Sequence, residues 1–126
     1  CAGVIIDLVA TLLFESDEKL GWARETFVEQ RYVDSIYHSY AVLIGSAKAL
    51  LLDKGVNSST QIGVMRDFNT HYGSDFDFNG FETFEDFVLQ INKNEPAIEF
   101  AASYLEQAAR FLNQVKTKRE SLIQVV

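Results

Sequence analysis

The sequence predicts an all-α fold, an antiparallel bundle of about five helices in a single domain over residues 1–126. Three observations favour this class. The chain contains one proline, apolar residues recur with the 3.6-residue period of α-helices, and the alternation typical of β-strands is nearly absent. Hydrophobic residues make up 48% of the chain, enough for one core. Because the sequence begins at Cys1 and not at methionine, we expect a fragment of a longer protein.

Two long helices are expected first. Residues 2–30 place Ile6, Leu13, Leu20 and Phe27 at steps of seven, which makes one buried stripe that a bend at Gly21 would interrupt. Residues 31–54 form the central helix, which ends at Gly55 in a left-handed cap. Its main apolar face contains Ile36, Tyr40, Leu43, Ala47, Leu50 and Leu51.

A second face of the central helix is the candidate groove or interface. Small residues on this face let a neighbouring helix approach closely. Its members are His38, Val42, Gly45, Ala49 and Leu52.

Three shorter or later helices complete the expected bundle. Ser58 is expected to cap a helix that ends at Gly73, with Gln61 reaching back to the cap. Thr83 caps the next helix. The last helix begins near Pro96 and carries a continuous apolar stripe as far as Val115.

Charge and cysteine content exclude several classes of function. The chain has 18 acidic and 11 basic residues, a net charge of -7, which disfavours binding to nucleic acid or anionic membranes. The apolar run from Val4 to Phe14 is shorter than the roughly 20 residues that span a bilayer. Cys1 is the only cysteine, so the span has no internal disulfide, no thiolate metal cage and no ligand set for an iron–sulfur cluster. We expect a cytoplasmic protein without a cofactor of its own.

Arg31 and His38 are the candidate catalytic pair. They lie seven residues apart, which places them on the same side of the central helix two turns apart. An arginine that holds a scissile phosphate and a histidine that moves its proton would suit a metal-independent ribonuclease. The competing interpretation is a hydrogen-bonded histidine at a helix interface. A zinc site that uses His38 and His71 would need carboxylates recruited by the fold.

The acidic loop DFDFNGFETFED is a candidate calcium site. Asp75, Asp77, Asn79, Gly80 and Asp86 match positions 1, 3, 5, 6 and 12 of a calcium-loop template. The short Asp86 side chain and the charged residue at position 8 depart from that template. The alternative is an acidic surface loop that Phe76, Phe78 and Phe81 anchor to the bundle.

The run YVDSIYHSYAVLIGSAKALLLDKGVNSSTQIGVMRDFNTHYG, residues 32–73, resembles HEPN domains, as does the later segment FAASYLEQAARFL. The resemblance implies a helical bundle that often dimerises through its long helices. In nuclease members of this family an arginine and a histidine lie close together on a late helix. The segment YLEQAARFLNQVKTKRESL contains no histidine, and Arg31 and His38 lie on an earlier helix.

The segments CAGVIIDLVATLLFESDEKLGWA and LQINKNEP further resemble the C-terminal helical extension of bacterial sulfite and nitrite reductases. This resemblance implies that sirohaem and an iron–sulfur cluster belong to an absent upstream part of the chain. The expected function is therefore a non-catalytic module that contacts protein, either an upstream domain or a second copy in a homodimer.

Overall fold

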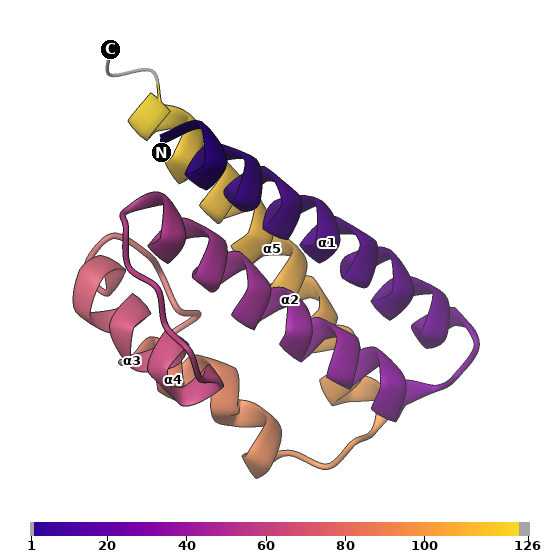
Figure 1. The fold of residues 1–126 in the computed structure, drawn as a ribbon. Coiled ribbons are helices and arrows are strands. Elements are labelled where there is room, and N and C mark those ends of the chain that lie inside the picture. The colour runs from indigo at the N-terminus through magenta and orange to yellow at the C-terminus, as the bar shows by residue number, and fades with distance from the viewer. Residues whose placement is uncertain (1, 124–126) are drawn as a thin grey trace.

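The computed structural model describes the backbone of residues 2–123 and the side chains of residues 8–122, all of them in helices and connecting loops (Figure 1). No β-strand occurs in residues 2–123, so the predicted all-α class is confirmed. The helices are α1 (Ala2–Val28), α2 (Tyr32–Asp53), α3 (Gln61–Tyr72), α4 (Phe84–Val88), the 3-10 helix η1 (Leu89–Lys93) and α5 (Ile98–Ile123).

Helix α2 is the centre of the bundle. It contacts α1, α3, α4 and α5, and its contact with α1 is the most extensive between any two elements described. Helices α1 and α2 run antiparallel, α5 lies behind them, and α3 and α4 lie on the other side of α2 (Figure 1). This arrangement leaves one face of α1 and one face of α2 uncovered on the same side of the molecule. Within residues 2–123, none of the helices combines the length and apolar character that a bilayer-spanning segment requires.

The turn between α1 and α2 is closed by backbone hydrogen bonds. The Gln30 N–H donates to the Phe27 carbonyl over 3.0 Å, and the Arg31 N–H donates to the Thr26 carbonyl over 2.8 Å. This pair of bonds is the Schellman motif, whose C′ position requires a left-handed backbone. Gln30 occupies that position with a φ of 65°, although glycine is the usual residue there. The residue type at position 30 does not indicate this turn geometry.

The end of α2 has the same motif with glycine in place. Gly55 has a φ of 86°, and the N–H groups of Gly55 and Val56 donate to the carbonyls of Leu52 and Leu51. The predicted left-handed cap at Gly55 is thus confirmed.

Helix α1 runs through Gly21 as one element, which confirms the single helix predicted there and excludes the alternative of a break. The predicted cap of α3 is wrong. The cap of α3 is Thr60 and not Ser58: the Thr60 side chain accepts a hydrogen bond from the Gly63 N–H, while the Ser58 hydroxyl donates to Asp67. Gln61 is the first residue of α3, so its side chain does not serve as the partner in a capping box.

An aromatic cluster around Phe68 packs α3, α4 and the loop between them against α5. Phe68 is fully buried and its ring lies 4.6 Å from the ring of Phe84 and 5.4 Å from that of Phe111. Phe76 and Phe78, from the loop before α4, join the same cluster. The predicted role of these loop phenylalanines as anchors is confirmed.

The two left-handed positions make opposite predictions for stability. Gln30→Gly removes a backbone strain of about 1–2 kcal/mol from the folded state. Glycine also has more conformational freedom in the unfolded chain, which lowers the free energy of unfolding by about 0.5–1 kcal/mol. We expect a net gain of about 0.5–1 kcal/mol in the free energy of unfolding. Gly55→Ala introduces the same strain and should lower that free energy by about 1 kcal/mol. Urea unfolding of both variants measures the two effects, and a loss of stability in Gln30→Gly would contradict the assignment.

Candidate protein-interaction surface

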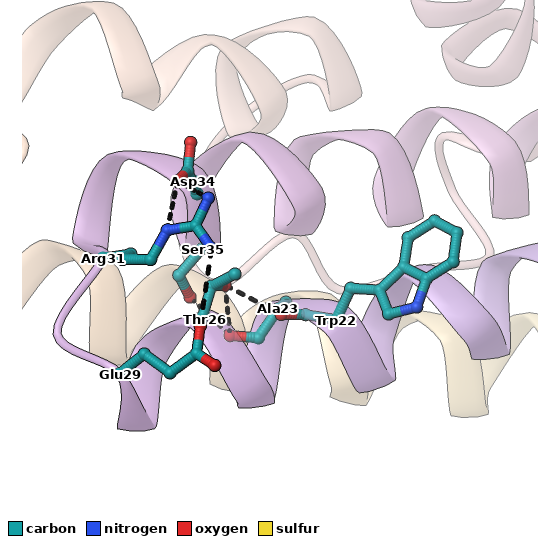
Figure 2. A network of polar contacts seen from close by, with 7 residues as sticks. All are labelled: Trp22, Ala23, Thr26, Glu29, Arg31, Asp34 and Ser35. Atoms are coloured by element: carbon teal, nitrogen blue, oxygen red, sulfur yellow. Dashed lines mark hydrogen bonds and ion pairs between the residues drawn. The ribbon is translucent and has the colours of Figure 1, made fainter.

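Arg31 is engaged by two carboxylates at the start of α2. Its Nε and Nη2 atoms lie 2.8 and 2.6 Å from Asp34 Oδ2, and Nη1 lies 3.5 Å from Glu29 Oε1 (Figure 2). All three side chains are largely exposed. The local field around this guanidinium is therefore neutral to acidic, which does not favour capture of a phosphate.

His38 packs against α1. Its ring lies 5.8 Å from the ring of Trp22 in an edge-on arrangement with a 62° angle between the planes. Two helical turns, about 10 Å of rise, separate it from Arg31. The structure brings His38 to Trp22 and Arg31 to Asp34, and it does not bring the predicted pair into contact.

The side chains proposed for metal ions do not converge. Among the described residues, no group of three or more His, Cys, Asp or Glu side chains is placed to hold a metal ion, and this includes His71. In the acidic loop, Asp75 lies 3.6 Å from Lys118, Asp77 accepts a hydrogen bond from the Asn79 N–H, and Asp86 lies in the first turn of α4. The geometry therefore gives the calcium hypothesis no support.

The predicted interface face of α2 packs on α1 of the same chain. Val42 and Ala49 are fully buried, His38 contacts Trp22, and a Cβ built on Gly45 would lie 2.8 Å from Ser16 Oγ. Leu52, at the end of this face, is half-buried. The small residues thus admit α1, and no second molecule is needed to cover this flank.

The exposed face of α2 lies beside the predicted one. Tyr37 is 69% exposed and separates two hollows on either side of the helix. One, of about 220 Å³, is lined by Val33, Ile36, Ile91 and Phe100. The other, of about 250 Å³, has a floor of Ala41, Ile44 and Gly45 and lies between Leu12 of α1 and Gln61 of α3.

Tyr40 fixes one wall of the second hollow. Its hydroxyl donates a hydrogen bond of 2.7 Å to Gln61 Oε1, which ties α2 to α3. Burial raises the pKa of Tyr40, and the neighbouring Tyr37 raises it further. The hydroxyl therefore stays protonated and remains a donor at physiological pH.

Two lysines without acidic partners line the same hollow. Within the described residues, Lys19 of α1 and Lys48 of α2 form neither an ion pair nor a hydrogen bond. Sequence reasoning missed these lysines, because their meeting depends on how α1 and α2 align.

The outer face of α1 complements this hollow in charge. Leu8 and Trp22 are 49% and 48% exposed and lie fourteen residues, four turns, apart on one side of the helix. Glu15 and Glu18 lie between them, exposed and without ion-pair partners in the described part of the chain. We call the uncovered faces of α1 and α2 together the α1–α2 face: Leu8, Glu15, Glu18, Lys19, Trp22, Tyr37, Ala41, Ile44 and Lys48.

Comparison with known proteins finds one similarity. The chain is 25% identical to "Putative toxin MJ0605" of Methanocaldococcus jannaschii, in an alignment that covers 91% of each protein. No protein-family model and no solved structure matches the chain. The resemblance to reductase extensions receives no support from these comparisons.

Gly45 and Ser16 give a test of the α1–α2 contact. Ser16 is buried and its hydroxyl donates to the Leu12 carbonyl over 3.0 Å, so it cannot move freely away from a new methyl group. Gly45→Ala should lower the free energy of unfolding by about 1–3 kcal/mol through overpacking. Adding Ser16→Ala removes the obstructing oxygen and should recover part of that loss, measured as a coupling energy in a double-mutant cycle. Strictly additive effects would contradict the contact.

Proposed function

We propose that this chain is a non-catalytic interaction module that forms a homodimer by packing the α1–α2 faces of two copies together. One observation carries the proposal. Two lysines and two glutamates, none of which forms an ion pair within the described chain, lie beside exposed apolar side chains on one face of the molecule. Association would remove the exposed apolar side chains of this face, Leu8, Trp22 and Tyr37, from water. The HEPN resemblance, in which dimerisation through long helices is common, agrees with this assignment.

The levels of the residues along the two helices support a specific arrangement. Ser16 lies opposite Gly45, and Trp22 lies beside His38, so Glu15 and Glu18 are level with the stretch of α2 between Gly45 and Ala41. A two-fold axis parallel to the helices leaves the height of each residue along the helix axis the same in both copies. It places α1 of one copy over α2 of the other. Four helices then pack as a bundle.

In that arrangement the charges complement one another. Glu18 of the second copy lies at the level of Lys19, and Glu15 of the second copy lies about three residues of helix from the level of Lys48. Each copy contributes both halves of the pairing, so the interface contains four such contacts. Complementary charges of this kind fix register and discriminate against wrong partners more than they add affinity.

The apolar part of the face supplies the driving force. Trp22 of one copy lies at the level of Tyr37 of the other, and Ala41 is small enough to let a neighbouring helix approach α2. Aromatic side chains at the centre of an interface commonly dominate its energetics. An interface of this type resembles the four-helix bundles formed by paired helical hairpins.

A metal-independent ribonuclease that uses Arg31 and His38 is the alternative function. The relative's printed name describes a toxin, and nuclease HEPN proteins use an arginine and a histidine. The carboxylates of Glu29 and Asp34 around Arg31 favour the interaction module instead. If the chain is joined to a reductase with sirohaem and an iron–sulfur cluster, the same face would dock on that upstream domain and the isolated module would be a monomer.

Tyr37→Glu should dissociate the dimer, because it buries a charge without a partner at the centre of the interface. We expect sedimentation to show a dimer for the unchanged protein and a monomer for the variant at equal concentration. Trp22 is the only tryptophan, so its emission should shift to the red on dissociation. Val28→Glu is the matched control, since Val28 is 80% exposed and lies outside the α1–α2 face. A monomeric unchanged protein would contradict the proposal.

A charge exchange tests the register independently. Lys19→Glu with Lys48→Glu should raise the dissociation constant at least tenfold, equivalent to about 1.4 kcal/mol. Adding Glu15→Lys and Glu18→Lys to the same chain restores opposite charges across the two-fold axis and should recover dimerisation. A fourfold variant no tighter than the double variant would exclude this register, even if the protein dimerises.

A further inference from the structure

A large hollow lies between α1 and α5, on the flank of α1 that faces away from α2. It has a volume of about 550 Å³, within the range of small-molecule sites, about 300–1,000 Å³. Ala10, Leu13 and Phe14 form its apolar wall, and Phe14 is more than half exposed. Its charged end is formed by α5, where Lys116 and Arg119 line the hollow.

Arg119 is the unexplained group in this hollow. Its side chain is only 16% exposed, and its Nε atom is buried without a hydrogen-bond partner. The nearest acid is Asp53 at the end of α2, whose Oδ1 lies 3.9 Å from Nε, too far for a hydrogen bond. A buried donor left without an acceptor lowers stability, and the effect is larger when the donor is charged.

The remaining charges of the hollow do not satisfy Arg119. Asp17 is held by Lys116 through contacts of 2.7 and 2.8 Å, so these two side chains neutralise each other. Glu18 and Glu120 also line the hollow, but both are exposed and neither forms an ion pair with a described residue. The guanidinium is therefore the cation with unused hydrogen-bonding capacity next to an apolar wall.

We propose that this hollow binds an amphipathic carboxylic acid, with the carboxylate on Arg119 and the apolar body along Leu13 and Phe14. Arginine presents a planar fork that matches a carboxylate with two parallel hydrogen bonds. An apolar cleft with one convergent polar group is the usual form of a small-molecule site. Asp53, which does not line the hollow, competes for the same guanidinium, and the loose contact of 3.9 Å leaves room for a better acceptor.

The site is independent of the dimer proposed above. Its lining residues lie on the α5 side of α1, and only Glu18, on the crest of that helix, belongs to both surfaces. Failure of dimerisation would leave this proposal unchanged, and the reverse also holds.

Titration with octanoate, followed by ¹⁵N-resolved NMR, tests the proposal in the unchanged protein. We expect saturable shifts of the Arg119 Nε–H signal and of the backbone amides of Leu13 and Phe14. Octan-1-ol, which has the same body without the charge, should bind at least tenfold more weakly. Equal binding of acid and alcohol would reduce the site to an apolar patch and overturn the proposal, as would the absence of saturable shifts.

Two variants separate ligand binding from a purely structural role of Arg119. Arg119→Lys keeps the charge but loses the planar fork, so octanoate should bind at least tenfold more weakly. Asp53→Asn removes the competing carboxylate and should tighten octanoate binding several-fold. A structural ion pair alone predicts no such tightening, so unchanged affinity in Asp53→Asn would contradict the proposal. Arg66→Lys on α3, which contacts Glu85 and lies outside the hollow, is the matched control.

Discussion

The close packing of α1 on α2 is the constraint on which the rest of the structure depends. Gly45 lets α1 approach until the Ser16 side chain fills the space that a Cβ would take. The Ser35 hydroxyl, which donates to the Ala23 carbonyl over 2.8 Å, ties the same helices near their connecting turn (Figure 2). Helix α5 occupies another flank of α2, and α3 and α4 occupy a third. On α2 itself, only a narrow strip around Tyr37 and Ala41 therefore remains exposed for contact with another molecule.

The same packing decides which charges find partners. Most of the cations in the described chain meet an acid or an aromatic ring: Lys116 meets Asp17, Arg66 meets Glu85, and Lys54 lies over the ring of Tyr72. Lys19 and Lys48 project from adjacent helices into one hollow that contains no carboxylate. Glu15, one turn before Lys19 on α1, is the acid of the same chain placed to interact with it, although the two side chains form no ion pair in the structure.

Periodicity in the sequence was sufficient for the fold class and for most of the core. The stripe of α2 from Ile36 to Leu51 follows directly from residue spacing, because burial repeats with the helical period, and the aromatic anchors around Phe78 follow from the large apolar rings in an otherwise polar loop. Local caps were less predictable. Both Ser58 and Thr60 can cap a helix, and the choice of Thr60 depends on Asp67, which accepts a hydrogen bond from the Ser58 hydroxyl.

The candidate site was harder to predict than the fold, for a physical reason. A helical wheel correctly shows that His38, Val42 and Ala49 share a face, but it does not show whether that face meets a helix of the same chain or of another. The decision depends on the alignment of α1 with α2, which Gly45, Ser16 and the turn at Gln30 set together. The surface left over, with Tyr37 between two hollows, is defined only after the internal contacts are known.

Arg31 illustrates why spacing alone does not establish a catalytic pair. Its backbone N–H completes the Schellman motif of α1, and its guanidinium bonds Asp34 within the first turn of α2. An arginine that holds a phosphate in a reaction needs hydrogen-bonding groups free for it, as Arg119 has and Arg31 has not. Exposed ion pairs such as that of Arg31 contribute only about 0–1 kcal/mol to stability, so the pair's main effect is on local charge. The arginine with unused capacity lies beside an apolar wall at the far end of α5, which suits the binding of an anion with a large apolar body better than the cleavage of a polyanion.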